Sequence, residues 1–124
     1  MARSKYNARR VTLDGFRFDS EAEARRYGEL KILQAAGTIA GLAVHPRFEL
    51  QAAFEDCEGQ RWPPVVYVAD FAYTENGAPV VEDVKGFETE AWKLKRRLFL
   101  ARYPEHALRV IYAGGPRPGG VKVK

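Results

Sequence analysis

Two apolar runs on either side of an Asn-Gly pair restrict the fold of this chain more than any other feature. The runs are VVYVADFAY (residues 65–73) and PVVEDVK (79–85), both rich in the β-branched and aromatic residues that favour strands. Asn76 and Gly77 suit the positive φ values of a tight hairpin turn. The sequence therefore predicts two antiparallel central strands, with Asp70 embedded in the first.

Two helices are predicted from their capping residues. Ser20 is a good N-cap, Glu23 completes a capping-box pattern, and Gly37 marks the end of the first helix. Thr89 begins the second helix, EAWKLKRRLFLARY, and Pro104 ends it.

Three further segments complete the predicted order of elements. RFELQAAF (47–54) alternates, so that every second residue from Phe48 to Phe54 shares one half-buried face. ALRVIYA (107–113) is a last strand, and VTLDGFRF (11–18) is a short hairpin. The core is therefore expected to run helix, three strands, helix, strand.

The length of the chain, 124 residues, allows one domain with a single core. Residues 14–112 are predicted to form it, after a basic arm (1–13) and before a Gly/Pro-rich basic tail (113–124). No stretch approaches the roughly 18–20 apolar residues of a membrane span, and no apolar segment follows the basic start as in a secretory signal. The expected location is the cytosol, without membrane contact.

The cysteine and histidine content limits the metal chemistry. Cys57 alone cannot form an internal disulfide, and His45 and His106 are too few for a Cys/His zinc cluster. Any bound metal is therefore expected to be held mainly by carboxylates.

The net charge of +4 favours a polyanionic partner, either a nucleic acid or an anionic membrane. Basic residues gather in the N-terminal arm, in the second helix and in the tail. Those of the tail are interpreted as solubilising charge. The helix group consists of Lys93, Lys95, Arg96 and Arg97.

Charges among the valines of PVVEDVK are unusual for a core strand. Alternation places Asp83 and Lys85 on one face, and Glu82 with Val84 on the other. In the predicted hairpin Asp70 and Asp83 lie side by side, where their repulsion and desolvation favour a divalent metal between them. The alternative is a surface ion pair between Asp83 and Lys85, with Asp70 hydrogen-bonded to a loop.

Each predicted helix also directs one charge at the sheet. Glu23 falls between Tyr27 and Leu30 on the apolar face of the first helix, although capping alone would explain it. Lys95 lies near the centre of the apolar arc of the second helix, although a lysine there can extend its ammonium to solvent. That arc consists of Ala91, Trp92, Leu94, Leu98, Phe99 and Ala101.

This ordered set of residues resembles the PD-(D/E)xK, or restriction-endonuclease-like, nuclease superfamily. The segments FDSEAEARRY, PRFELQ, YVADFAY, VVEDVKGF and WKLKRRLF are similar to those of a family of small phage proteins that resembles Holliday-junction resolvases. The resemblance covers roughly residues 16–112. It implies an α/β (α+β) fold with an αβββαβ core and a mixed central sheet flanked by helices, and, for a phage protein, the host cytoplasm.

The resemblance also implies the roles of the site residues. Asp70 and Asp83 would bind Mg²⁺ directly, with the Val84 carbonyl as a third ligand and Mn²⁺ as a substitute ion. Glu23 would contribute directly, through water or at a second metal. Lys85 would orient the attacking water or help to deprotonate it.

Three details qualify this assignment. Lys95, together with Arg96, would hold the scissile phosphate or stabilise the transition state. A bulge in the strand would turn Glu82 toward the metal, whereas the two-residue spacing to Lys85 favours Asp83. Ala69 stands where the superfamily motif has proline, a departure that touches no ligand.

The expected activity is therefore metal-dependent endonucleolytic cleavage of branched DNA. The phosphate backbone would be bound by Arg9, Arg10, Lys93, Arg96 and Arg97. Paired cuts in a two-fold junction favour a homodimer. Two alternatives use the same residues: a non-catalytic DNA-binding recombination accessory protein with a nuclease-like fold, and a nicking, flap or restriction-like nuclease.

Overall fold

The computed structural model describes residues 9–114, so the predictions for the first eight residues of the basic arm and for residues 115–124 of the tail lie outside the described residues. In chain order the elements are β1 (Val11–Leu13), β2 (Phe16–Phe18), α1 (Glu21–Ala35), β3 (Ala40–Val44), β4 (Arg47–Gln51), β5 (Phe54–Glu55), β6 (Arg61–Trp62), β7 (Val65–Val68), β8 (Phe71–Glu75), β9 (Ala78–Lys85), α2 (Glu90–Arg102) and β10 (Ala107–Tyr112).

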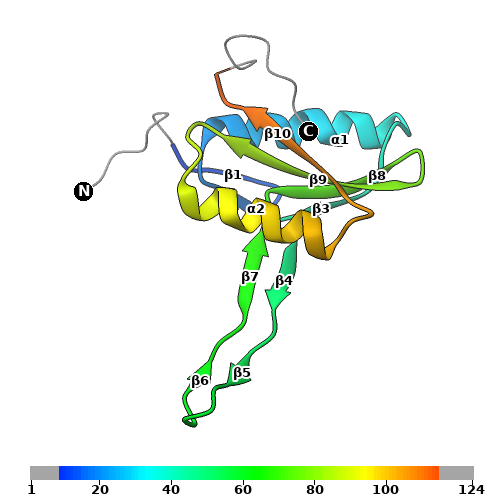
Figure 1. Cartoon of the computed structure of the whole chain (residues 1–124). Helices are drawn as coiled ribbons and strands as arrows, with labels where there is room; N and C mark the ends of the chain where they lie inside the picture. The colour runs from blue at the N-terminus through cyan, green and yellow to red at the C-terminus, as the bar shows by residue number, and fades with distance from the viewer. Residues whose placement is uncertain (1–8, 115–124) are drawn as a thin grey trace.

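The central sheet has the strand order β10-β9-β8-β3 (Figure 1). β9 and β10 are parallel, whereas β8 is antiparallel to both of its neighbours. Parallel neighbours need a crossover, and α2 supplies it between β9 and β10. The predicted fold class, α+β with a mixed central sheet, is therefore confirmed.

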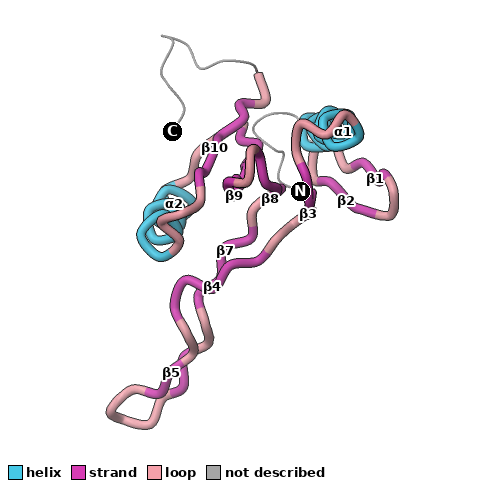
Figure 2. Tube along the Cα trace, turned by 90° about the vertical axis from the view of Figure 1, so that its right-hand side faces the viewer, coloured by secondary structure: helices cyan, strands magenta, loops and turns pink. Residues whose placement is uncertain are grey.

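The two helices lie on opposite sides of β8 and β9 (Figure 2). α1 contributes Tyr27 and Leu30 to a core with Phe18 and with the β9 residues Val80 and Val84. The spacing of these β9 residues shows that one face of the strand packs toward α1.

The other face of β9 packs toward α2. Val81 belongs to a second core, which α2 supplies with Trp92 and Phe99. Because β9 is covered on both sides, its carboxylates Glu82 and Asp83 are buried as well, and each must find partners.

The capping predictions are confirmed. The Ser20 hydroxyl accepts a hydrogen bond from the Glu23 N–H at 3.1 Å, and the Thr89 hydroxyl accepts one from the Trp92 N–H at 3.0 Å. Gly37 follows α1 with a φ of +81°, the left-handed conformation that ends many helices. The predicted turns also form, with positive φ at Asp14 in the first hairpin and at Asn76 in the second.

The stretch VVYVADFAY forms two strands, not the single strand predicted. β7 pairs with β4 outside the central sheet, and β8 pairs with β3 and β9 inside it. The strands change partners at Ala69-Asp70, directly opposite His45-Pro46, where the Ala69 N–H donates to the Pro46 carbonyl (3.0 Å) and the His45 N–H donates to the Asp70 carbonyl (2.9 Å). The two arms of this long hairpin, β3–β4 and β7–β8, therefore bend at the same position along their length, and Asp70 lies at the bend.

The local sequence pattern does not predict β3. Its sequence, AGLAV, has only one β-branched residue, and its pairing with β8 is irregular between Ala40 and Ala43. Long-range pairing with β8, which the local pattern does not encode, makes it a strand.

The outer half of the bent hairpin leaves the body of the molecule (Figure 1). The strand predicted over 47–54 is interrupted between β4 and β5. Two residues of its expected half-buried face, Ala52 and Phe54, are exposed. No core reaches this far from the central sheet, so Phe54 instead stacks on Trp62 of β6, with ring centroids 6.3 Å apart.

The apolar arc predicted for α2 is partly wrong. Trp92 and Phe99 are buried, but Leu94 is 57% exposed and Leu98 41% exposed, and Ala91 and Ala101 are also exposed. The helix is rotated so that its large rings meet the sheet, because the rings bury more apolar area than the leucines do.

α1 and α2 are the helices of the described part of the chain, and neither is long and apolar enough to cross a membrane.

Candidate metal-binding active site

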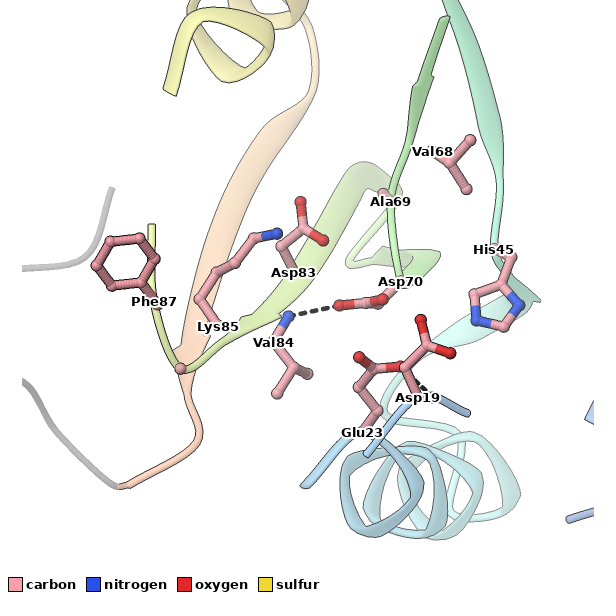
Figure 3. Close-up of a pocket in the computed structure, with 11 residues that line it drawn as sticks. Asp19, Glu23, His45, Val68, Ala69, Asp70, Asp83, Val84, Lys85 and Phe87 are labelled. Carbon is pink, nitrogen blue, oxygen red and sulfur yellow. Dashed lines mark hydrogen bonds between the residues drawn. The ribbon is translucent and has the colours of Figure 1, made fainter. Parts of the chain in front are cut away.

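A pocket of about 370 Å³ opens where the hairpin bends, beside the first turn of α1 and the end of β9 (Figure 3). A water in the liquid takes about 30 Å³, so this pocket has space for a hydrated ion. It is lined by Asp19, Glu23, His45, Val68, Ala69, Asp70, Asp83, Val84, Lys85, Gly86 and Phe87. The predicted residues Glu23, Asp70, Asp83, Val84 and Lys85 are thus brought together from two elements, α1 and β9, and from the bend.

Asp70 precedes β8, which begins at Phe71, and at the bend its side chain points into the pocket. Its N–H still donates to the Glu82 carbonyl (3.1 Å), and its Oδ2 accepts a hydrogen bond from the Val84 N–H (2.7 Å). Burial, followed by the negative charges of Asp83 and Glu23, raises the pKa of Asp70 to about 8. Without a cation, the site therefore retains a proton that a bound cation would displace.

Asp83 is held firmly from the α2 side. Its Oδ2 accepts hydrogen bonds from the Trp92 Nε1–H (2.9 Å) and from the Tyr67 hydroxyl, and the residue is only 2% exposed. A surface ion pair with Lys85 is therefore the wrong alternative. Tyr67 and Trp92 were missed as site residues, because within an apolar run an aromatic side chain reads only as core.

Val84 faces the pocket with its backbone. The pairing of β8 with β9 ends at Phe71 and Glu82, so the edge of β9 at Val84 has no strand partner there. The N–H of Val84 turns to Asp70 instead, and in a strand the carbonyl of the same residue points to the same edge. Ligation by this carbonyl stays a prediction.

Glu23 lies both at the start of α1 and in the lining of the pocket, and its role as a metal ligand stays a prediction. Its Oε1 accepts a hydrogen bond at 3.3 Å from the N–H of Asp19, the residue before the N-cap, instead of from the Ser20 N–H of an ordinary capping box. The side chain is nevertheless 6% exposed and lines the pocket, and burial raises its pKa. A carboxylate oxygen of Glu23 lies within 4.8 Å of ligand atoms of both His45 and Asp70.

His45 also lines the pocket, although the sequence did not predict it as a site residue. A signal existed in the His-Pro pair directly before RFELQ, since proline interrupts a ladder and often marks a change of strand. The bend puts His45 beside Asp70 (Figure 3).

Lys85 also lines the pocket. Its ammonium lies 4.8 Å from the centroid of the Trp92 ring, whose other neighbour is the Arg96 guanidinium at 4.7 Å. Trp92 thereby positions the carboxylate of Asp83 and both of these cations.

Lys95 is not brought into this pocket. Its ammonium donates to the Val66 carbonyl (3.0 Å), and the residue lines a neighbouring pocket with Tyr67 and Trp92. Lys95 does face the sheet, as predicted, but it meets β7 instead of the carboxylates.

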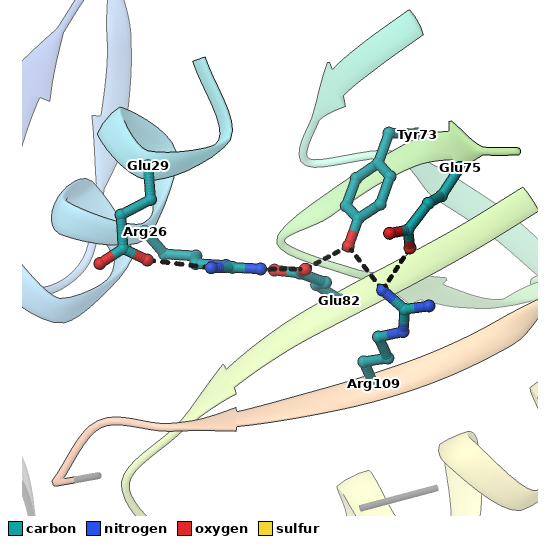
Figure 4. Close-up of polar contacts among 6 residues, drawn as sticks. All are labelled: Arg26, Glu29, Tyr73, Glu75, Glu82 and Arg109. Atoms are coloured by element: carbon teal, nitrogen blue, oxygen red, sulfur yellow. Dashed lines mark hydrogen bonds and ion pairs between the residues drawn. The ribbon is translucent and has the colours of Figure 1, made fainter. Parts of the chain in front are cut away.

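Glu82 lies on the opposite face of β9, in a buried network (Figure 4). It is 0% exposed, and its two oxygens accept from the Nε (2.8 Å) and Nη2 (2.6 Å) of Arg26 on α1. Tyr73 donates to it too, and contacts Arg109 at 3.4 Å. The alternative in which Glu82 replaces Asp83 in the site is therefore wrong.

The basic residues expected to bind DNA lie outside the pocket. Arg9 pairs with Glu21 (3.2 Å) and Lys93 with Glu90 (3.3 Å), and all four of these side chains are substantially exposed. Arg10 and Arg97 are exposed as well. Each remains accessible to a polyanion.

Comparison with protein-family models matches residues 3–114 to the family described as "Protein of unknown function (DUF1064)". No curated protein matches the chain by sequence. The family match spans every residue that lines the pocket.

Proposed function

The chain belongs to the DUF1064 family, and from that premise we propose that it is a metal-dependent endodeoxyribonuclease of the PD-(D/E)xK type that cuts branched DNA, similar to Holliday-junction resolvases. The observation that carries the proposal is the convergence of buried Asp83 and Glu23 and half-buried Asp70 on one pocket that also contains Lys85. Buried carboxylates without a cation cost stability, so a functional use is the simplest reason for them.

The donor set fits Mg²⁺ or Mn²⁺. Both ions prefer carboxylate and carbonyl oxygens, which Asp70, Asp83 and Val84 provide on the proposed ligand set. The pKa of Asp70 is raised by burial and, next, by the negative charges of Asp83 and Glu23, and a bound cation would offset these charges. When bound, such an ion polarises a phosphate oxygen and makes a water more acidic.

The protein residues have separate tasks in this proposal. Tyr67 and Trp92 hold the carboxylate of Asp83 in one orientation, which keeps the site preorganised. Lys85, at the same pocket, orients the attacking water or takes up its proton. Lys95, one pocket away, is assigned to a phosphate next to the scissile one.

Cations on α2, of which Lys93 and Arg97 are exposed and Arg96 is half-buried, would bind the DNA backbone without reading bases, which suits selection by DNA shape. We assign this role to Lys93, Arg96 and Arg97, and to Arg9 and Arg10 beside the first hairpin. A homodimer is part of the proposal, because a two-fold protein matches the two symmetric cuts of a junction.

The test is cleavage of labelled four-way junction, flap, single-stranded and duplex DNA, each with Mg²⁺, with Mn²⁺ and with EDTA. The wild type is expected to make paired, metal-dependent nicks in the junction. Asp70→Asn, Asp83→Asn and Lys85→Ala should each lose this activity and remain folded. Glu58→Gln removes an exposed carboxylate from the outer hairpin and should cut normally.

The outcomes separate the alternatives. Cutting of another substrate in preference to the junction would make the protein a nicking, flap or restriction-like nuclease. Junction binding without cleavage in either metal would overturn the nuclease proposal and favour a DNA-binding accessory protein.

A further inference from the structure

We propose that His45 is a metal ligand, which with Glu23 and Asp70 forms a mixed nitrogen and oxygen site that binds Mn²⁺ in preference to Mg²⁺. The inference deepens the proposed function and rests on it, because it concerns the ion of the same pocket. It adds a residue outside the acidic and lysine set that defines the predicted nuclease site.

The distances allow one ion to be shared. One imidazole nitrogen of His45 and one oxygen from each of the two carboxylates all lie within 4.8 Å of one another. Ligand atoms at about 2.1 Å from one ion are separated by about 3 to 4 Å. Side-chain movements of about 1 Å would therefore close the three groups around an ion.

The backbone holds His45 in an unusual conformation that directs it into the pocket. Its φ is +55°, a left-handed value that is uncommon outside glycine. The conformation is held by the hydrogen bond from the His45 N–H to the Asp70 carbonyl (2.9 Å) and by the adjacent bond from the Ala69 N–H to the Pro46 carbonyl (3.0 Å). Strained backbone of this kind gathers at functional sites.

The imidazole of His45 is held in place by packing, but its nitrogens make no hydrogen bond among the described residues. Its ring lies 5.7 Å from the Phe18 ring, which is fully buried and limits its rotation. Among residues 9–114, neither ring nitrogen has a hydrogen-bond partner. A half-buried imidazole with a free nitrogen toward two carboxylates has the donor that a metal would use.

The chemistry of the donors sets the preference. Mg²⁺ favours oxygen ligands and loses its waters reluctantly, whereas first-row transition ions accept imidazole nitrogen. A site with one nitrogen and several carboxylate oxygens therefore favours Mn²⁺ over Mg²⁺. Without the nitrogen, the same carboxylates would discriminate less between the two ions.

Direct detection of the nitrogen is the sharpest experiment. Mn²⁺ is added to the full-length protein, its affinity and that of Mg²⁺ are measured by calorimetry, and nitrogen coupling to Mn²⁺ is measured by electron spin-echo envelope modulation. His45→Asn is the main variant, because asparagine tolerates positive φ and should keep the bend. His106→Asn is the matched control, since the chain has two histidines and His106 packs against Phe48 and Phe99, outside the pocket.

The wild type and His106→Asn are expected to show nitrogen coupling and tighter binding of Mn²⁺ than of Mg²⁺. His45→Asn should lose the coupling and bind Mn²⁺ roughly tenfold more weakly, with Mg²⁺ affinity changed much less.

The other outcomes distinguish failure of the His45 inference from failure of the nuclease proposal. Mn²⁺ binding that depends on Asp83 but shows no nitrogen coupling in the wild type overturns the His45 inference and leaves the nuclease proposal intact. Failure to bind either ion overturns both. Nitrogen coupling without DNA cleavage supports the His45 ligand and overturns the nuclease activity.

Discussion

At the scale of single residues, the pocket is a place where the chain accepts a loss of stability. Asp70 is surrounded by the charges of Asp83 and Glu23, and its compensation from the protein is one hydrogen bond from the Val84 N–H. The pKa of Asp70 is raised to about 8 from an ordinary value of 3.8. Folding without a metal must therefore keep this group protonated or deprotonate it at a cost.

Asp70→Asn should stabilise the metal-free protein at alkaline pH. Between about pH 4 and pH 8 the folded wild type holds a proton on Asp70 that the unfolded chain has released, so its free energy of unfolding falls as the pH rises. Asparagine removes this loss. We expect the variant to exceed the wild type by a few kcal/mol at pH 8.5 and by much less at pH 4.5. Urea unfolding in EDTA at both pH values measures the difference, and an advantage equal at the two values would contradict the explanation.

Tyr67→Phe tests whether the orientation of Asp83 matters. The change removes a hydroxyl that donates to Asp83 and leaves the ring in the core, so the fold should survive. A carboxylate freed from one of its two fixed donors should bind Mn²⁺ about tenfold more weakly, as for other groups that orient a ligand. Tyr103→Phe is the control, because that hydroxyl donates to the Glu49 carbonyl (2.8 Å) away from the pocket. Equal affinities for the two variants would show that Tyr67 serves packing alone.

At the scale of elements, the sequence predicted what local chemistry determines. Both helix N-caps, the Asn76-Gly77 turn and the opposite faces of Asp83 and Glu82 on β9 follow from residues within a few positions of each other. The break at Asp70 does not, because it depends on pairing with a strand more than twenty residues earlier. His45 escaped notice for the same reason, since only the bend brings it to the carboxylates.

The face on which α2 packs against the sheet also could not be predicted from the local sequence pattern. The leucines of α2 outnumber its buried rings, so the average direction of its apolar side chains predicts the wrong buried face. The contact with β9 is instead made by Trp92 and Phe99. Trp92 carries part of the site because this rotation turns its Nε1–H onto Asp83.

The Arg26–Glu82 pair joins α1 to β9 and should be a strong point of the fold. Glu82 is fully buried, so Arg26→Met would leave its carboxylate without its main partner at a cost of roughly 3 to 5 kcal/mol. The double variant Arg26→Met, Glu82→Met removes both charges and should lose clearly less. Urea unfolding of the wild type, both single variants and the double variant gives the coupling energy. Additive single effects would mean that the pair does not act as a unit.

At the scale of the whole molecule, the sheet separates two differently charged environments. α1 and α2 cover opposite sides of it (Figure 2), and the exposed residues Lys93 and Arg97 lie on α2. The net charge of +4 is therefore less informative than its location. A long polyanion that reaches the pocket past α2 would meet these side chains, whereas Lys31 lies on α1, on the opposite side of the sheet.

Arg97→Gln and Lys93→Gln should weaken binding to junction DNA without changing the metal affinity of the pocket. Each lost phosphate contact should lower the slope of log affinity against log salt by about 1, and the loss should be similar for unrelated junction sequences. Binding is measured by fluorescence anisotropy at several salt concentrations in EDTA, with Asp83→Asn as the shared background so that no DNA is cut. Lys31→Gln removes one cation from the α1 side and should leave the slope unchanged. If Lys31→Gln weakens binding as much as Arg97→Gln, the DNA does not approach over α2, and the pocket must be reached from the α1 side.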